Sequence, residues 1–523
     1  MDRVNAAEQQ RRLEQARLDG GKTTQERNRL GQFATPFPLA LEIAQLAVEH
    51  LKNEHYTIDT IDFLDPGCGS GVFYSALLQT SIANQLGSAY GIEIDPAFAE
   101  VARSLWAPFG FQVIQDDFTR LTSFFKPDLP NLIICNPPYS RHHHLEQLQK
   151  NLLQTRASKT SGLWLNGLAG LYCYFLLLSH QWLRPGGLSI WLIPTEFMDV
   201  NYGEAIRIYL SQHVTLKRLH RFEASDVQFA DALVSSAVVV FENRKPTIEH
   251  QAIFTVGSSL SQPSKTYTVK NEWLSKAHKW THVPESISPS TQRTQPEISF
   301  GNLFKVRRGL ATGANGYFIL PRSKAEEQGL PAKFLKPILP SPRYLTDVVI
   351  EADGDGYPLR IPQLVLIDCD WPEEQVQAEY PSLWEYLEHG KRLGIHERYL
   401  TSKRNPWYKQ EQVPASPFLC TYMGRAQENK SPLRFIWNQS KATSPNVYHV
   451  IYPREHLTAY MGNSLELQAE IFRLLSRIDN QIIISEGRTY GGGLHKIEPH
   501  ELYRISLSNI AEAQKLVAST MLF

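Results

Sequence analysis

Cysteine is scarce in this sequence, and long hydrophobic runs are missing. The five cysteines are scattered over 523 residues without C-x-x-C pairs, which argues against a structural zinc site and against a disulfide framework. The longest apolar stretches, around residues 171–179 and 237–241, are too short to cross a bilayer. The first 22 residues are polar and charged, unlike a signal peptide. We therefore expect a cytoplasmic protein in a reducing compartment, with no membrane partner and no metal.

An excess of charge of one sign is also lacking. The sequence has 53 Lys and Arg against 53 Asp and Glu, so a nucleic-acid surface would require these charges to be segregated. Residues 391–441 do segregate them, with ten Lys or Arg and three acids. Aromatic residues are interleaved with these cations, namely Tyr399, Trp407, Tyr408, Tyr422 and Trp437. The mixture suits a DNA surface, although a solvated basic face over an aromatic core would have the same composition.

The chain is long enough for two or three domains. Between residues 61 and 241, β-rich runs alternate with helical segments, which predicts a mostly parallel α/β sheet of one domain. Seven strands are expected, the last two antiparallel, at residues 61–64, 89–94, 111–114, 132–135, 188–194, 216–222 and 233–241. The alternation stops after residue 241. We predict a helical extension at residues 1–30, an α/β domain at 31–245, a linker or crossing segment with some local strands at 246–298, and an α+β domain at 299–523.

A glycine-rich loop, Asp65-Pro66-Gly67-Cys68-Gly69-Ser70-Gly71, follows the first expected strand and precedes a helix. Glycines let the backbone approach a ligand closely, and open α/β sheets bind ligands at the carboxyl ends of their strands. A tight turn between a strand and a helix would need glycine even without a ligand. The loop lacks the G-K-[ST] sequence of a phosphate-binding P-loop, so a triphosphate is not favoured.

Acidic residues stand at the ends of the next two strands. Glu93 and Ile94 end the second strand, about 22 residues after the glycine loop, where an acid is placed to bind ribose hydroxyls. Asp117 and Phe118 follow the third strand, where an acid can accept from an exocyclic amine and a ring can cover an adenine. Asp95, directly after Ile94, could instead cap the next helix, and Asp117 could be a turn residue. NAD would suit the ribose acid too, and the end of the fourth strand decides against it.

The fourth strand ends in Asn136-Pro137-Pro138-Tyr139. Each proline fixes its own φ and biases the residue before it toward an extended conformation. Such a rigid corner can hold a planar amine, with oxygens accepting its N–H groups and the tyrosine ring on its π-face. An ordinary turn is the alternative for the motif taken alone.

In this order, the motifs resemble those of the class I S-adenosylmethionine-dependent methyltransferases. More narrowly, they resemble the DNA adenine-N6 methyltransferases of bacterial restriction–modification systems. Cofactor motifs come first, then Asn-Pro-Pro-Tyr, then a target-recognition region, which is the gamma arrangement. The resemblance covers essentially the whole chain and is strongest over residues 31–241. It implies a Rossmann-like catalytic domain, a C-terminal DNA target-recognition domain, and S-adenosyl-L-methionine as the cofactor.

The resemblance also assigns site residues. The cofactor set that it implies is Thr35, Pro36, Asp65, Pro66, Gly67, Gly69, Glu93, Ile94, Asp117, Phe118, Asn136 and Phe175. Helical spacing makes Phe175 an expected core residue as well. Asn136, Pro137, Pro138 and Tyr139 would be catalytic, because hydrogen bonds from the adenine N6 amine to the Asn136 oxygen and the Pro137 carbonyl would localise the nitrogen lone pair. The target adenine would be flipped out of the duplex and stacked on Tyr139, with Phe229 as a looser second match.

Basic residues in four segments are expected to contact DNA. The candidates are Arg141, Lys305, Arg307, Arg308, Lys403, Arg404, Arg425, Arg488 and Lys496. Three consecutive histidines follow Arg141, but adjacent residues cannot all face one metal ion on a regular element. The partners implied are double-stranded DNA and a separate cognate restriction endonuclease, and we expect a monomer. The N-terminal helix could pack on the DNA, on the catalytic domain or on a partner.

Other functions share parts of this pattern. Methylation of adenine N6 in RNA would need the same corner. Enzymes that methylate a glutamine amide in protein release factors also contain Asn-Pro-Pro-Tyr, but they are much shorter than this chain. A DNA-binding module without enzymatic activity would not need Asp65, Glu93, Asp117 and Asn136 together.

Overall fold

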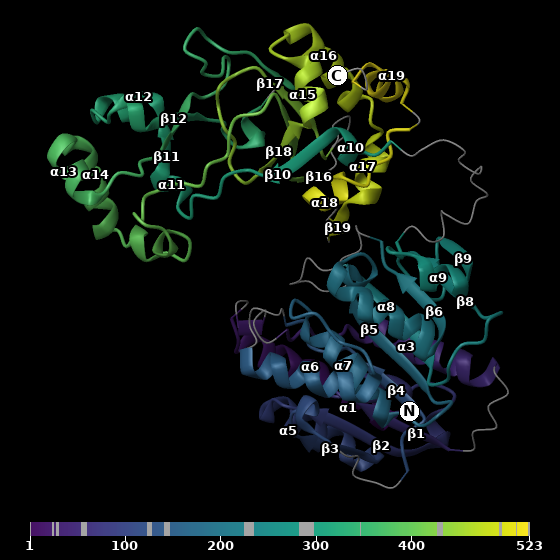
Figure 1. Ribbon diagram of the computed structural model, residues 1–523. Coiled ribbons are helices and arrows are strands. Elements are labelled where there is room, and N and C mark those ends of the chain that lie inside the picture. The colour runs from purple at the N-terminus through teal and green to yellow at the C-terminus, as the bar shows by residue number, and fades with distance from the viewer. Residues whose placement is uncertain are drawn as a thin grey trace. The chain divides into compact units, whose positions relative to one another are not determined.

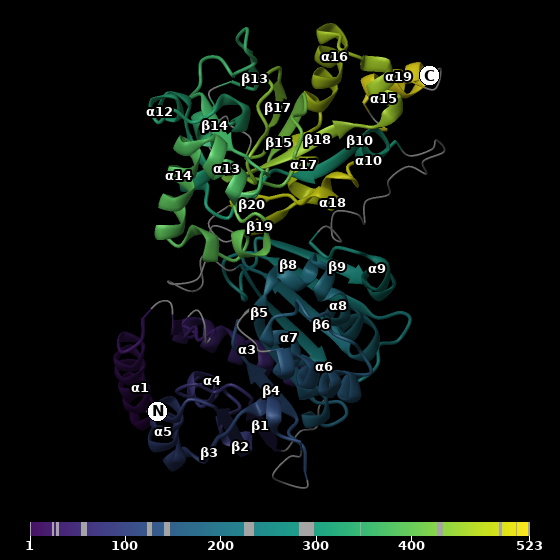
Figure 2. The same ribbon diagram turned by 60° about the vertical axis from the view of Figure 1, so that its left-hand side comes forward.

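Two compact units make up the chain in a computed structural model (Figures 1 and 2). The first comprises Met1–Thr291 with Tyr490–Gly492, and the second comprises Gln292–Thr489 with Gly493–Phe523. The structure describes residues 2–23, 26–27, 31–53, 60–122, 128–140, 147–223, 235–281, 298–345, 347–425, 432–490, 494–508 and 510–520. No helix in these ranges is both long and apolar enough to span a membrane.

The first unit is built on one mixed sheet with the strand order β3-β2-β1-β4-β5-β7-β6-β8-β9. The strands β3, β2, β1, β4 and β5 are parallel, and β7 pairs antiparallel with both β5 and β6. The bounds are β1 Ile61–Asp65, β2 Leu86–Glu93, β3 Phe111–Gln115, β4 Leu132–Cys135, β5 Leu188–Pro194, β6 Thr215–Arg221, β7 Ser236–Glu242, β8 Gln251–Val256 and β9 Lys265–Lys270. This confirms the predicted class I methyltransferase fold, with all seven expected strands present.

The sheet has nine strands rather than seven. The two additional strands, β8 and β9, lie within residues 246–298, the predicted linker or crossing segment, and join the large sheet; helix α9 (Asn271–Lys276) follows them. These strands are at the edge of the sheet and half polar: in β8, Ala252 and Phe254 are buried while Gln251 and Ile253 are exposed. A strand with one solvent-exposed face can be rich in Gln, Thr and Lys, and such a composition resembles that of a loop.

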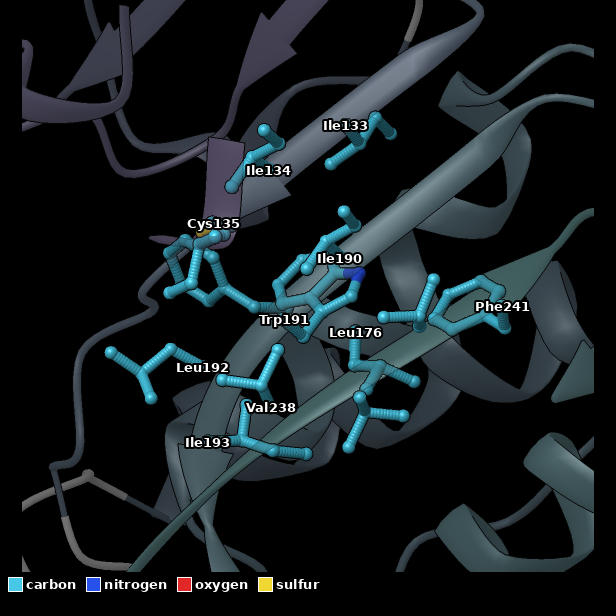
Figure 3. Close-up of a cluster of buried hydrophobic side chains, with 14 of the residues drawn as sticks. Ile133, Ile134, Cys135, Leu176, Ile190, Trp191, Leu192, Ile193, Val238 and Phe241 are labelled. Carbon is cyan, nitrogen blue, oxygen red and sulfur yellow. The ribbon is translucent and has the colours of Figure 1, made fainter. Parts of the chain in front are cut away.

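Helices cover both faces of the central strands. They are α1 Asp2–Gly20, α3 Phe37–Asn53, α4 Val72–Leu77, α5 Pro96–Trp106, α6 Gln147–Ser161, α7 Leu171–Leu178 and α8 Glu204–Ile208. Every residue of β4, β5 and β7 is buried, as expected for strands covered on both faces. Figure 3 shows part of this core, with Ile134, Ile190 and Val238 from the three strands and Leu176 from α7. The core fixes the strand ends from which the candidate site is built.

The second unit combines small sheets with helices, as predicted for an α+β domain. Its sheets have the orders β10-β18-β15-β17-β13, β11-β14-β12 and β16-β20-β19. The strands are β10 Phe304–Arg308, β11 Ile319–Pro321, β12 Leu335–Ile338, β13 Val349–Ile350, β14 Leu364–Ile367, β15 Phe418–Thr421, β16 Met423–Arg425, β17 Phe435–Asn438, β18 Tyr448–Pro453, β19 Arg488–Tyr490 and β20 Leu494–Lys496. The helices are α10 Phe300–Leu303, α11 Asn315–Phe318, α12 Arg322–Glu327, α13 Glu373–Glu379, α14 Pro381–Arg392, α15 Glu455–Met461, α16 Leu465–Ser476, α17 Asn480–Glu486, α18 Pro499–Leu502 and α19 Ala511–Thr520.

Candidate active site

A cavity of about 390 Å³ lies at the carboxyl ends of β1, β2, β3 and β4 in the first unit. Parallel strands end at the same edge of a sheet, and this brings together residues that are far apart in the sequence. The cavity is lined by all of the predicted cofactor residues except Pro36, namely Thr35, Asp65, Pro66, Gly67, Gly69, Glu93, Ile94, Asp117, Phe118, Asn136 and Phe175.

The glycine loop is fixed by hydrogen bonds to two strand ends. The Gly67 N–H donates to Asp65 Oδ1 at 3.1 Å, and the Gly69 N–H donates to Glu93 Oε2 at 2.9 Å. Gly71 caps helix α4 with φ of 86°, and a Cβ there would lie 2.6 Å from the Trp106 ring. Glycine is therefore required at residue 71 both by its backbone conformation and by the indole packed against it.

Two buried carboxyl groups face the same space. Asp65 is 1% exposed and its Oδ2 has no hydrogen-bond partner among the described residues. Burial raises the pKa of the Asp65 carboxyl to about 8, opposed by the Gly67 hydrogen bond and reinforced by the charge of Glu93. Burial likewise raises the pKa of Glu93, against hydrogen bonds from the N–H groups of Asp95 and Gly69. An orphaned buried carboxyl beside a second acid fits a ligand that brings a positive charge.

Aromatic rings form the wall near the ends of β3 and β4. Phe118 and Phe175 are buried, border the cavity and have ring centroids 5.1 Å apart. Asp117 caps the short helical turn that contains Phe118, because its carboxylate accepts the Thr119 N–H at 2.9 Å. Asp95 similarly caps α5 by accepting the Ala97 N–H at 3.0 Å. Both acids thus serve as caps, the alternative left open for them, while Asp117 also borders the cavity.

The Asn136 amide has a defined orientation. Its Nδ2 donates to the Phe33 carbonyl oxygen at 3.0 Å and to Thr35 Oγ1 at 2.9 Å. Since a carbonyl oxygen can only accept, the nitrogen of the amide must point toward residues 33–35. The amide oxygen, Oδ1, is buried and has no partner in the described part of the chain. Asn136 therefore presents an unsatisfied acceptor at a cavity that it helps to line.

Tyr139, the last residue of the corner, is bonded to the neighbouring strand β5 and does not line the cavity. Tyr139 is 7% exposed, and its hydroxyl donates to the Leu192 carbonyl oxygen on β5 at 3.0 Å. Pro138 and Ser140 border the cavity, whereas Pro137 and Tyr139 do not. The backbone N–H of Tyr139 donates to the Gly31 carbonyl oxygen at 3.1 Å, which ties the corner to the segment before α3. Two predicted residues, Arg141 and Phe229, lie outside the described residues.

Helix α1 contributes residues that the sequence analysis did not identify as part of the site. Arg11, Gln15 and Asp19 all line the cavity. The helix packs on the catalytic domain, one of the three locations left open for it, through Glu8 and Arg11, which are both buried. Its sequence is mostly polar, and its few apolar residues do not form the stripe that would normally indicate a buried helix face.

Known proteins match both halves of this arrangement. One family model, described as Eco57I restriction-modification methylase, matches residues 88–228, and another, described as Type II methyltransferase M.Eco57I, C-terminal domain, matches residues 279–521. The Type II methyltransferase M.AccI of Acinetobacter calcoaceticus is 27% identical over 95% of this chain and 89% of its own length. M.XamI of Xanthomonas campestris pv. amaranthicola is 28% identical over 86% of this chain and 80% of its own length. Together these matches identify the chain as a DNA methyltransferase of the restriction–modification type.

A solved structure supports the assignment of the fold. The type IIL restriction-modification enzyme MmeI, determined in complex with DNA, superposes with a TM-score of 0.57 at 14% identity, over 93% of this chain and 68% of MmeI. At this level of identity the likeness concerns the fold alone.

In the second unit of this methyltransferase, some predicted DNA-binding residues gather around one ring. Arg308 lies 4.8 Å and Lys496 lies 4.9 Å from the centroid of the Tyr422 ring. Tyr422 immediately precedes β16, whose exposed Arg425 is paired with Leu494 of β20. Lys305 on β10 is exposed too. Lys403 is also exposed, with its ammonium 3.9 Å from the centroid of the Tyr399 ring.

Other predicted DNA-binding residues of the methyltransferase are bonded within the second unit. Arg404 donates to the carbonyl oxygens of Ala311 at 2.7 Å and Thr312 at 2.9 Å. Arg307 is paired with Glu411, and Arg488 donates to the fully buried Glu501 at 2.8 Å. These bonds favour a structural role for the three arginines.

Proposed function

We propose that this methyltransferase transfers a methyl group from S-adenosylmethionine to N6 of an adenine in a specific sequence of double-stranded DNA. It would serve as the modification enzyme of a restriction–modification system. The observation that carries the proposal is the buried, unpartnered Oδ1 of Asn136 at the edge of a cavity lined by two buried acids. A cationic methyl donor and an amine acceptor would satisfy both features at once.

The residues that line the cavity fit S-adenosylmethionine. When bound, it supplies an electrophilic methyl group on a sulfonium. The unpartnered Asp65 carboxylate would accept from the ammonium of the methionine end, and Glu93 would accept from ribose hydroxyls. Asp117 and the rings of Phe118 and Phe175 would hold the adenine. A buried acid is stabilised in its charged form when a cation arrives, so the pocket becomes electrostatically satisfied only when it is loaded.

The target amine needs two acceptors. The lone pair of an exocyclic amine on adenine is delocalised into the ring, which makes the nitrogen a poor nucleophile. Hydrogen bonds from its N–H groups to Asn136 Oδ1 and to the Pro137 carbonyl oxygen would hold the nitrogen in a geometry that localises the lone pair. Phe33 and Thr35 hold the Asn136 amide in place beforehand, so little reorganisation is required during reaction. The proton is lost from the product ammonium without a strong base.

Adenine within a duplex cannot reach a cavity at the strand ends of the catalytic sheet, so the base must be flipped out. We assign the stacking of the flipped base to Tyr139 and Phe229, and the DNA backbone contacts to the exposed cations of the second unit and to Arg141. A cognate endonuclease that acts on the same sequence would be the functional partner. Cytoplasmic location and a monomeric state complete the proposal.

The test is single-turnover methylation by Asn136→Ala. We expect a rate reduced by at least about 100-fold, because removal of one preorganised transition-state contact typically costs 10²–10³, with the Kd for DNA nearly unchanged. Asn151→Ala, an exposed change on α6, is the matched control and should behave as wild type. Nucleoside analysis of the product should give N6-methyladenine from duplex DNA. Normal single-turnover rates for Asn136→Ala would contradict the mechanism, and methylation of RNA but not DNA would favour the alternative substrate.

A further inference from the structure

We propose that Arg11, on helix α1, binds the carboxylate of the methionine end of the cofactor. This inference rests on the proposed function, since it names a second binding residue for the same cofactor. The N-terminal helix would then take part directly in cofactor binding, because it carries the guanidinium group that contacts the carboxylate.

Arg11 is held next to the glycine loop by a buried polar network. Its guanidinium donates to Ser70 Oγ at 3.0 Å, and Ser70 Oγ donates onward to Gln15 Oε1 at 2.7 Å. Glu8 accepts from Arg11 Nε at 2.7 Å and from Nη2 at 2.8 Å, and also from Ser75 Oγ on α4 at 2.7 Å. The network fixes the guanidinium against the loop that follows β1.

The cavity has a strong imbalance of charge. Five acids line it, namely Asp19, Asp65, Glu93, Asp116 and Asp117, whereas Arg11 is the one Lys or Arg among the described residues that do so. Those acids that are ionised would repel a carboxylate unless a cation were at hand. Glu8 neutralises part of the charge of Arg11, but Arg12 also pairs with Glu8 at 2.8 Å, so this group of one acid and two bases remains net positive.

Arg11 has hydrogen-bonding capacity left over. A guanidinium has five N–H bonds, and the contacts with Glu8 and Ser70 use three of them. The side chain is only 4% exposed, so bulk water is largely excluded from the remaining two. An anion at the cavity wall would be the most stabilising partner for these two N–H groups, since hydrogen bonds between charged groups are stronger than those between neutral groups.

The place of Arg11 selects the methionine end of the cofactor. An amino acid zwitterion needs an acid and a base within the same part of a site. Asp65 begins the glycine loop with an unpartnered carboxyl oxygen, and Ser70 near its end accepts from Arg11. The adenine side is instead formed by Asp117 and two phenylalanine rings. The glycine loop therefore has a candidate partner for each charge of the zwitterion.

The experiment compares two ligands that differ only in this carboxylate. Binding of S-adenosylmethionine and of decarboxylated S-adenosylmethionine is measured by calorimetry with the full chain. We expect Arg11→Gln to weaken S-adenosylmethionine about 10- to 100-fold, the range for a charged hydrogen-bonded contact, and to weaken the decarboxylated ligand less than about 3-fold. Arg17→Gln, on the same helix but 66% exposed, should leave both affinities unchanged.

A second variant separates ligand binding from the folding of α1. Arg11→Gln leaves Glu8 buried with fewer partners, which can destabilise the helix. The double variant Glu8→Gln/Arg11→Gln removes both charges, and it should show the same selective loss for S-adenosylmethionine. Equal weakening of both ligands in both variants, or no weakening of either, would overturn the role of Arg11. If the wild-type protein bound neither ligand, the proposed function itself would fail, and the inference with it.

Discussion

At the scale of single residues, Tyr139 joins two roles that can be separated. Its hydroxyl is bonded to the Leu192 carbonyl oxygen on β5, while its ring is the proposed platform for the flipped base. We expect Tyr139→Phe to keep base binding within about 5-fold of wild type, because only one hydrogen bond worth about 1 kcal/mol is lost. Tyr139→Leu should weaken it about 10-fold or more, since stacking contributes about 1–3 kcal/mol. Binding of the flipped base is measured by the fluorescence of 2-aminopurine at the target position. Equal base binding by Tyr139→Phe and Tyr139→Leu would contradict stacking on Tyr139.

The Asp65 carboxyl makes both stability and cofactor binding depend on pH. Burial raises the pKa of Asp65 from 3.8 to about 8 in the folded, ligand-free protein. Between these values the folded state holds a proton that the unfolded state has lost, so this carboxyl lowers stability progressively as pH rises. We expect Asp65→Asn to raise the melting temperature, and by more at about pH 8 than at about pH 5.

Cofactor affinity should change in the opposite direction with pH. A bound cation favours ionised Asp65, so the affinity of the wild-type protein for S-adenosylmethionine should increase between about pH 6 and about pH 8. The weaker affinity of Asp65→Asn should be nearly flat over that range. Calorimetry at three pH values decides this, and identical pH profiles for the two proteins would exclude Asp65 as the titrating group.

At the scale of elements, the segment before α3 and the corner after β4 are packed backbone to backbone. Gly31 has φ of +68°, and a Cβ there would lie 2.3 Å from the Ser140 nitrogen. We expect Gly31→Ala to reduce turnover by at least about 10-fold and the free energy of unfolding by about 1–3 kcal/mol. The added Cβ would force the backbone at residue 31 or at Ser140 to shift, and neither shift is possible without strain. Gly20→Ala is the control, since a Cβ there has open space. Unchanged turnover in Gly31→Ala would show that the corner tolerates displacement.

Elements differed in how far the sequence could predict them. The bounds of β4 and β5 were predicted correctly, because fully apolar runs between turn residues indicate buried strands. The cofactor residues could be placed together because parallel strands end at one edge of a sheet. For β8 and β9 the sequence predicts only some local strands without bounds, since their composition is half polar. The buried contacts of α1 are polar too, so Glu8 and Arg11 look the same in the sequence as a solvated pair. Packing of Tyr139 onto β5 depends on tertiary contacts that no local pattern encodes.

At the scale of the whole molecule, basic and acidic residues balance, so DNA binding must depend on a few exposed cations. We expect Arg425→Ala to weaken DNA binding and to reduce the slope of log K against log salt by about 0.9, the value for one phosphate contact. Arg404→Ala should instead lower the melting temperature, because it leaves the Ala311 and Thr312 carbonyls without their donor, and should leave the slope unchanged. Arg360, exposed and paired with Glu351, is the control cation. Equal slopes for Arg425→Ala and wild type would remove Arg425 from the interface.

The strand pair β8 and β9 also determines how the large sheet ends. With β9 at the margin, the sheet ends in a strand with a lysine at each end, Lys265 and Lys270, rather than in β6, which would be the last strand without this pair. Charged edge strands discourage a second molecule from adding its own strand. We therefore expect the pair that enlarges the catalytic sheet also to disfavour edge-to-edge association at this end of the sheet.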